Sequence, residues 1–384
     1  MKTAFVGGYI FDSDKEVFKR ANLICEDGYV SSISDSLPDG CLTIDISDKY
    51  VIPGLVDIHT HGIAGFDFNY ADEGQIKEMC RAYAKKGTTS IMATLASATM
   101  SSLHDSIFSI NQNRLNENHD MATILGVHLE GRYLNPQARG AHAIEMLALP
   151  NLEELKSLAL SMMPPPIHIS LAPELKGAPE FIKSALEYGA TVSVAHTKAS
   201  YEEALEAISL GACSFTHTFN AMTPVHHRMP GAAVCALTCD EAYSEIICDG
   251  EHIHPAMVKL AYKSKPSDKL VLITDSMCAA ALEYDGEYKI AGTDVIVKDG
   301  RATDKNGVLA GSTLTLFKAL TNFMEFCSVP LEEAVKFATV NPARLIKAEL
   351  VGKLDNGYCA DFIVIDDKNN PQISRVYVGG KQIC

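Results

Sequence analysis

The sequence predicts an α/β fold, in which a TIM-like (β/α)8 barrel is joined to a small β-sandwich domain formed by both termini. Three observations support this class. Short apolar runs alternate with helical stretches in the middle of the chain, eight such runs are present, and both ends are rich in β-forming residues. Strands that alternate with helices are typical of parallel βα units, and eight units are the number that closes a barrel.

The two ends of the chain share one composition. Residues 1–53 and 346–384 contain short β-rich segments that are separated by Gly, Asp and Pro. We therefore expect these two segments to form the small β-sandwich domain together, and residues 54–345 to form the catalytic barrel. Residues 283–312 break the alternation with strand-like stretches between Gly and Asp, which predicts a β insertion near the mouth of the barrel.

Eight apolar runs account for the strands of the predicted barrel. In chain order they are GLVDIHTH, TSIMATL, TILGVHLEG, IHISLAPE, TVSVAHT, SFTHTFNAM, YSEIICDGEHI and LVLITDSM. Amphipathic stretches such as EGQIKEMCRAYAKKG and YEEALEAISLGA lie between them and predict the covering helices.

Seven of these eight runs end in a side chain that can bind a metal or transfer a proton. In (β/α)8 barrels the chemistry lies at the C-terminal ends of the strands. A random distribution of polar residues would not place them at the same end of seven strands, so the pattern predicts an active site at that end of the barrel. The residues, in chain order, are His59 with His61, Glu130, Glu174, His196, His217, His252 and Asp275.

The stretch PGLVDIHTHG raises the question of a metal most directly. Side chains alternate along a strand, so Asp57, His59 and His61 point to one face. Polar residues also cluster at the ends of strands that bind nothing, so His59 and His61 alone do not establish a metal site. His and carboxylate donors without thiolates suit Zn, Fe, Mn or Co. Such an ion would activate water and Asp275 could take its proton, which favours a metal-dependent hydrolase.

Composition excludes several other classes. The chain of 384 residues is 47% hydrophobic and carries a net charge of −15, which argues against nucleic acid and anionic membranes as partners. Eleven cysteines without a CxxC pair indicate reduced thiols rather than a disulfide framework. The first residues do not read as a signal peptide, and no run is long enough for a membrane span. We therefore expect a cytoplasmic protein.

Several motifs together resemble one family. PGLVDIHTHG, HLEGRYLNP, SLAPE, VAHTKAS, THTFNAMTPVHHRMPG, DGEHIHP, ITDSM and LAGSTLTL occur in this order, from about residue 53 to residue 341. They resemble the N-acetylglucosamine-6-phosphate deacetylases of the amidohydrolase superfamily. The resemblance implies hydrolysis of N-acetyl-D-glucosamine 6-phosphate to D-glucosamine 6-phosphate and acetate, in amino-sugar metabolism.

The same resemblance implies a metal site. Glu130, His196 and His217 would be the ligands, with Glu130 in the place that a carboxylated lysine holds in many relatives. His59 and His61 would be ligands of a second site, which some members use and others lack. The alternative is that these two histidines only line the barrel floor. One or two divalent ions per subunit are therefore expected.

The resemblance also implies roles for the residues around the substrate. Asp275 would be the general base and then the acid, and His142 in RGAHA would polarise the acetyl carbonyl. His252 would contact the sugar. Part of the family's phosphate clamp can come from a neighbouring subunit, which implies a homodimer. The clamp would comprise Asn220, Ala221, His227 and Arg228, and the residues near the N-acetyl group would be Leu309, Ala310, Gly311 and Ser312.

Two departures and two alternatives remain. Arg132 stands where the family commonly has Pro, and the chain has no Trp to stack on a sugar. Another amidohydrolase, acting on an unphosphorylated cyclic amide or amine, would not need His227 and Arg228. A barrel that had lost catalysis and served as a scaffold would not need the predicted metal ligands together with Asp275.

Overall fold

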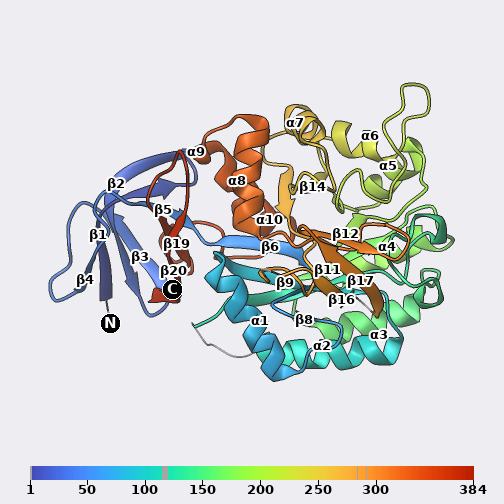
Figure 1. The fold of residues 1–384 in the computed structure, drawn as a ribbon, viewed down its shortest axis with the longest axis horizontal. Coiled ribbons are helices and arrows are strands. Elements are labelled where there is room, and N and C mark those ends of the chain that lie inside the picture. Colours follow the sequence, from blue (N-terminus) through green and yellow to red (C-terminus); the bar gives the residue numbers. More distant parts are fainter. Residues whose placement is uncertain (1, 115–119, 283, 291) are drawn as a thin grey trace.

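The computed structural model describes residues 2–114, 120–282, 284–290 and 292–384 (Figure 1). The strands of the middle of the chain form one sheet of eight, and strands from both ends form a second sheet at its side (Figure 1). The predicted fold class is therefore confirmed. Among the described residues, no helix combines the length and the apolar character needed to cross a bilayer.

The barrel consists of eight parallel strands in sequence order. All of their residues except Thr123, Leu125 and Tyr243 are buried, as expected for a sheet that is covered on both faces. Strand β9, TTSIMATLA, is buried at every position. The strands are β6 (Leu55–Thr60), β9 (Thr88–Ala96), β10 (Thr123–Glu130), β11 (Ile167–Leu171), β12 (Thr191–Val194), β13 (Ser214–Phe215), β14 (Tyr243–Ile247) and β15 (Leu270–Ile273).

Within the described ranges, eight longer helices follow the pattern that the sequence predicts. Helix α1 begins at a capping box between Asp72 and Gln75, and α5 at one between Ser200 and Glu203. Each of these two helices buries one face, with Ile76 and Met79 on α1 and Ala204 and Ala207 on α5, so these faces pack on the barrel. The helices are α1 (Glu73–Lys85), α2 (Met100–Arg114), α3 (Leu152–Met162), α4 (Ala178–Glu187), α5 (Tyr201–Ser209), α6 (Ala232–Thr238), α7 (Pro255–Ser264) and α8 (Leu316–Cys327).

Short helical turns complete the layer around the barrel. Those before α3 lie in the loop after β10, and the others lie between α8 and the C-terminal strands. They are η1 (Pro136–Ala138), η2 (Ile144–Met146), α9 (Leu331–Ala334), η3 (Val335–Ala338) and α10 (Val340–Leu345).

The barrel closes at a seam between its first and last strands. Strands β6 and β15 stand at the two ends of the hydrogen-bonded order. Thr274 Oγ1 donates to Asp57 Oδ2 at 2.6 Å, and the Asp275 N–H donates to the His59 carbonyl oxygen at 2.9 Å. Residues of the predicted site therefore form part of the seam itself.

The second sheet interleaves the two ends of the chain. Its order is β21-β20-β19-β5-β1-β2-β3, with β4 beside β1. Phe5 packs edge-on against Phe362 and Tyr377 with ring centroids 4.8 Å apart in both pairs. The exact boundaries at residues 53 and 346 stay predictions. The strands are β1 (Lys2–Asp12), β2 (Val17–Glu26), β3 (Tyr29–Ser34), β4 (Leu42–Asp45), β5 (Tyr50–Pro53), β19 (Phe362–Ile365), β20 (Ile373–Val378) and β21 (Lys381–Gln382).

Two small antiparallel elements lie at the mouth of the barrel. Strands β7 (Gly62–Ile63) and β8 (Phe66–Asp67) pair after β6, and β16 (Gly286–Ile290), β17 (Thr293–Lys298) and β18 (Arg301–Asp304) form a three-stranded sheet after β15. This sheet lies within the predicted insertion, of which residues 283 and 291 are outside the described residues. Its apolar side chains pack with Met277, so it is anchored to the loop that carries Asp275.

Candidate active site

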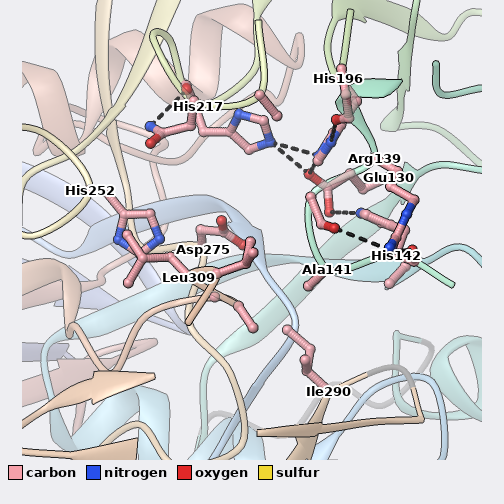
Figure 2. Close-up of a pocket in the computed structure, with 18 of the residues that line it drawn as sticks. Glu130, Arg139, Ala141, His142, His196, His217, His252, Asp275, Ile290 and Leu309 are labelled. Atoms are coloured by element: carbon pink, nitrogen blue, oxygen red, sulfur yellow. Dashed lines mark hydrogen bonds and ion pairs between the residues drawn. The ribbon is translucent and has the colours of Figure 1, made fainter. Parts of the chain in front are cut away.

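A cavity of about 690 Å³ opens at the C-terminal ends of the barrel strands (Figure 2). This volume lies in the usual range for small-molecule sites. Most of the residues that the sequence predicts for the site line it. They are His61, Glu130, His142, His196, His217, Asn220, Ala221, His252, Asp275, Leu309, Ala310 and Gly311.

Glu130 is the centre of a first group of donors. Its Oε1 lies 3.0 Å from His217 Nε2 and 3.3 Å from His196 Nε2, and the two Nε2 atoms are 3.1 Å apart (Figure 2). Bonds of about 2.0–2.1 Å to a tetrahedral zinc would place neighbouring ligand atoms about 3.3 Å apart. The donor types and their spacing therefore fit one divalent ion.

The other oxygen of Glu130 faces a second group of donors. His61 Nε2 lies 3.0 Å from Glu130 Oε2 and 3.3 Å from Asp275 Oδ1. His59 Nε2 lies 3.3 Å from both His61 Nε2 and Asp275 Oδ1. These four side chains could hold a metal ion together. The structure thus brings the two predicted donor sets to the two sides of one carboxylate.

The surroundings of His196 orient its ring toward Glu130. Its Nδ1 donates to the Ala138 carbonyl oxygen at 2.8 Å, which leaves the Nε2 lone pair free to act as a ligand. The loop can come this close because Gly140 has no side chain. A Cβ there would lie 3.1 Å from His196 Cε1, and Gly140 has a φ of +57°.

Three site residues adopt left-handed backbone conformations. His196, His217 and Asp275 have φ angles of 43°, 32° and 50°. Side-chain-bearing residues rarely adopt this region, and each such residue costs about 1–3 kcal/mol. Each of the three follows a short strand and directs its side chain into the cavity (Figure 2). Strain of this kind clusters at functional sites.

The carboxylates of the site are held in their charged form. Burial opposes ionisation of Glu130, but charged His59 and hydrogen bonds from neighbouring histidines hold its pKa well below the usual value. Burial likewise opposes ionisation of Asp275, and His59 and His61 hold its pKa well below the usual value. Both groups are therefore available as anionic ligands or proton acceptors at neutral pH.

His142 faces the same carboxylate from the loop after β10. The Ser97 N–H donates to His142 Nδ1 at 3.3 Å, so the ring proton of the neutral form is on Nε2, which lies 3.4 Å from Glu130 Oε2. Burial lowers the pKa of His142. A neutral imidazole with an N–H directed at the donor cluster can donate to a carbonyl oxygen of a bound substrate.

Other predicted residues brace the site. His252 Nδ1 contacts Asp249 Oδ2 at 2.6 Å. Ser312 does not line the cavity. Its N–H donates to the Asp275 carbonyl oxygen, and its Oγ donates to the Thr274 carbonyl oxygen, so it braces the backbone that carries Asp275. Glu174, at the end of the fourth run, accepts hydrogen bonds from Thr197 Oγ1 and the Lys198 N–H.

The predicted cationic cluster lies elsewhere. His227 and Arg228 are exposed on the loop after β13 and do not line the cavity of this chain. The cations that line it are Arg139, Lys198 and Arg301. Arg139 donates to the His142 carbonyl oxygen at 2.6 Å, and Arg301 Nε lies 3.8 Å from Glu251 Oε2.

Lys198 differs from the other two cations of the cavity. It is exposed, and no ion pair involves it within the described part of the chain. Its backbone N–H donates to Glu174 Oε1 at 2.6 Å, and the backbone N–H of the neighbouring Thr197 donates to the Ala221 carbonyl oxygen at 3.0 Å. Lys198 therefore belongs to the same wall as Ala221 and has a free ammonium group.

The model of the amidohydrolase family matches residues 50–383. The chain belongs to the amidohydrolase family. The N-acetylglucosamine-6-phosphate deacetylase of Lysinibacillus sphaericus is 34% identical over 346 residues, which cover 89% of this chain and 88% of the relative. The N-acetylgalactosamine-6-phosphate deacetylase of Escherichia coli O157:H7 is 30% identical, over 95% of this chain and 98% of the relative.

Solved structures agree with these similarities. The N-acetylglucosamine-6-phosphate deacetylase of Pasteurella multocida superposes with a TM-score of 0.91 at 27% identity, over 100% of this chain and 99% of that chain. A mutant of the Mycobacterium smegmatis enzyme in complex with N-acetyl-D-glucosamine-6-phosphate gives a TM-score of 0.90 at 28% identity, over the same shares. The amidohydrolase chain is thus similar to these deacetylases over both of its sheets.

Arg132 of this amidohydrolase has its contacts outside the donor cluster. Its guanidinium contacts both carboxylate oxygens of Glu154 at 3.2 Å, and it also donates to the Ala98 carbonyl oxygen. It does not line the cavity. Arg132 therefore braces the loop after β10 against α3.

Proposed function

We propose that this chain is a metal-dependent deacetylase that converts N-acetyl-D-glucosamine 6-phosphate to D-glucosamine 6-phosphate and acetate. The observation that carries the proposal is the convergence of His61, His142, His196 and His217 on the one carboxylate of Glu130, with Asp275 beside it. The names of the similar proteins support the substrate class. Neither a scaffold nor a structural barrel needs such a cluster.

We infer that Glu130, His196 and His217 hold one divalent ion, and that His59 and His61 complete a second site beside Asp275. Histidine and carboxylate donors without thiolate support Zn, Fe, Mn or Co as the ion. When bound, the ion supplies an activated water and polarises the substrate carbonyl.

The residues of the chain supply the remaining steps. The N–H of His142 Nε2 donates to the acetyl oxygen and stabilises the negative charge that develops there. Asp275 takes a proton from the water that attacks the acetyl carbon, and it then gives a proton to the sugar nitrogen as the carbon–nitrogen bond breaks. The products are acetate and the free amine.

The same proposal assigns the walls of the cavity. Leu309, Ala310 and Gly311 offer small or apolar surface to the acetyl group, with Ser312 holding Asp275 in position. His252 contacts the sugar.

The phosphate lies against Asn220 and Ala221, and the nearby ammonium group of Lys198 supports this placement. His227 and Arg228 are exposed, which suits residues that reach a neighbouring subunit, so the proposed assembly is a homodimer.

Three further features support a cytoplasmic enzyme for a small sugar phosphate. All eleven cysteines are free thiols, as is usual in a reducing compartment. The net charge of −15 disfavours nucleic acid and anionic membranes as partners. The cations that line the cavity offset the negative potential of the protein locally, at the place where an anionic substrate binds.

Hydrolysis of four substrates tests the proposal, measured as acetate release for the three N-acetyl sugars and as ring opening for the cyclic amide. The substrates are N-acetylglucosamine 6-phosphate, its 4-epimer N-acetylgalactosamine 6-phosphate, unphosphorylated N-acetylglucosamine and a cyclic amide, and metal content is measured on the same sample. We expect the first to have the highest kcat/KM. The galactosamine epimer is included because one similar protein carries that name. A preference for an unphosphorylated substrate would contradict the proposal.

A further inference from the structure

One buried acid has no role in the chemistry above. Glu245 lies in the middle of β14 and is fully buried inside the barrel. Neither of its carboxylate oxygens has a hydrogen-bond partner of good geometry among the described residues. A buried charge without compensation costs several kcal/mol, so its presence calls for a positive partner.

Two histidines face this carboxylate, one at each oxygen. Glu245 Oε1 lies 3.4 Å from His168 Nε2, and Oε2 lies 3.8 Å from His59 Nδ1. Both nitrogen atoms also lack another hydrogen-bond partner. His168 is fixed from its other side, where Nδ1 meets Thr191 Oγ1 at 2.8 Å. The interior of this barrel is thus polar directly below the site, where branched apolar residues usually fill such barrels.

His59 connects Glu245 to the donor cluster. Its Nδ1 faces Glu245, while its Nε2 lies 3.3 Å from Asp275 Oδ1 and 3.5 Å from Glu130 Oε1. When a metal ion replaces the proton on Nε2, the remaining proton on Nδ1 faces Glu245, and the lone pair of Nε2 is directed at the cluster. Metal-binding histidines are commonly oriented in this way by a carboxylate on their second nitrogen.

Charge balance gives a second argument. Two divalent ions would bring four positive charges to a site in which Glu130 and Asp275 supply two negative charges. Glu245, a third buried carboxylate next to His59, reduces this excess of positive charge without itself being a metal ligand. Its influence is greatest on the ion nearest to His59, because Coulomb interactions in a buried site are weakly screened.

We propose that Glu245 is the positioning residue that directs His59 Nε2 toward a metal ion and so enables this chain to hold a second ion beside the one at Glu130, His196 and His217. The proposal rests on the metal site of the proposed function. It concerns binding of the ion, which can be measured without any substrate.

Competition with a chromophoric chelator tests it. Metal-free protein is titrated with Zn²⁺ in its wild-type form and as Glu245→Gln, which keeps the shape of the side chain but removes its charge. We expect two equivalents in the wild type. In the variant we expect an affinity about 10–100-fold lower for one equivalent and an unchanged affinity for the other. Glu241→Gln, an exposed position shortly before the same strand, is the matched control.

Two further measurements separate positioning from a structural role. The melting temperature of the metal-free variants reports on folding alone. In a His59→Asn background, Glu245→Gln should cause no additional loss of metal affinity, because the ligand that it positions is already absent. Should Glu245→Gln not fold, Glu245→Asp withdraws the carboxylate by one methylene, keeps its charge and is expected to weaken the same equivalent.

Three results would overturn the proposal. They are a wild-type protein that binds a single equivalent, equal weakening of both equivalents, and unchanged binding in the Glu245 variants. Acetate release plays no part in these outcomes. A protein that bound two ions as expected but did not release acetate would reject the proposed function and leave the role of Glu245 intact.

Discussion

His61 Nε2 lies 3.0 Å from Glu130 Oε2, a contact that joins the end of the first barrel strand to the end of the third. Glu130 also contacts His196 and His217 through its other oxygen, so the carboxylate at the end of β10 meets residues at the ends of three other strands. Changes at this cluster should therefore affect metal content and turnover in ways that can be measured separately.

Asp275→Asn should lower kcat by roughly 10²–10⁴, because the proposed general base and acid is lost. The shape of the side chain is nearly unchanged, and Glu130, His196 and His217 are intact, so at least one equivalent of metal should remain. Steady-state kinetics and metal analysis of the same preparation check both parts. Turnover close to that of the wild type would exclude Asp275 from proton transfer.

Replacing His59 and His61 together by Asn should remove one equivalent of metal. These rings supply two of the four donors of the second group and none of the three donors of the first. Metal analysis after dialysis gives the result directly. If metal per chain and activity stayed as in the wild type, the two histidines would only line the barrel floor.

Lys198→Ala should lower kcat/KM for N-acetylglucosamine 6-phosphate by about 10- to 150-fold, which corresponds to one charge-assisted contact of about 1.5–3 kcal/mol. The unphosphorylated sugar should be affected little, since it lacks the group that the ammonium contacts. Lys263→Ala, an exposed position on α7, is the control. Equal losses on both substrates would show that Lys198 supports the loop and does not bind the phosphate.

Arg228→Ala decides whether a neighbouring subunit completes the phosphate site. In this chain Arg228 is exposed and outside the cavity. If a second subunit supplies it, kcat/KM for the phosphorylated sugar should fall by one to two orders of magnitude on the same estimate, and the unphosphorylated sugar should change little. The difference between wild type and variant should shrink when both are diluted below the dimerisation constant, because a wild-type monomer also lacks the arginine that a second subunit would supply. No change in kcat/KM at any protein concentration would exclude Arg228 from phosphate binding.

Asp361→Asn should stabilise the metal-free protein above pH 6. Burial raises the pKa of Asp361 from 3.8 to about 6, while Oδ1 accepts a hydrogen bond from the Gly379 N–H at 2.8 Å. The folded state thus holds this proton more tightly than the unfolded chain, so the stability that Asp361 contributes falls as pH rises from about 4 to 6 and is constant above.

The effect of Asp361→Asn should therefore be largest above pH 6 and absent below about pH 4. Its upper limit is about 3 kcal/mol, from a pKa difference of about two units. Melting temperatures at pH 4, 5, 6 and 7.5 check this, with Asp39→Asn on an exposed loop as the control. A variant that is less stable than the wild type at pH 7.5 would mean that the charged form is favoured in the fold.

The sequence was sufficient for the barrel and for the convergence of the candidate site residues, because both depend on local patterns. Alternating strands and helices predict the fold, and the position of Glu130, His196, His217 and Asp275 at strand ends predicts their convergence. The family resemblance added His142, which lies in a loop where no periodic pattern applies.

Residues whose position depends on the path of a loop were harder to predict. Arg139 and Arg301 reach the cavity through the loop after β10 and the three-stranded insertion, where no periodic pattern predicts the path of the chain. Lys198 could have been found, since it follows His196 by two residues at a strand end. Glu245 also left a signal, because a charged residue inside a fully buried strand requires a partner.

The pairing of β5 with β19 has a consequence for the synthesis of the protein. Ile52 is hydrogen-bonded in register with Ile363, so the small sheet needs strands from both ends of the chain. All eight barrel strands leave the ribosome before Phe362 does. The barrel can therefore fold while the edge of β5, with Val51 and Ile52, still lacks its partner, and a nascent chain at that stage presents an apolar strand edge that chaperones recognise.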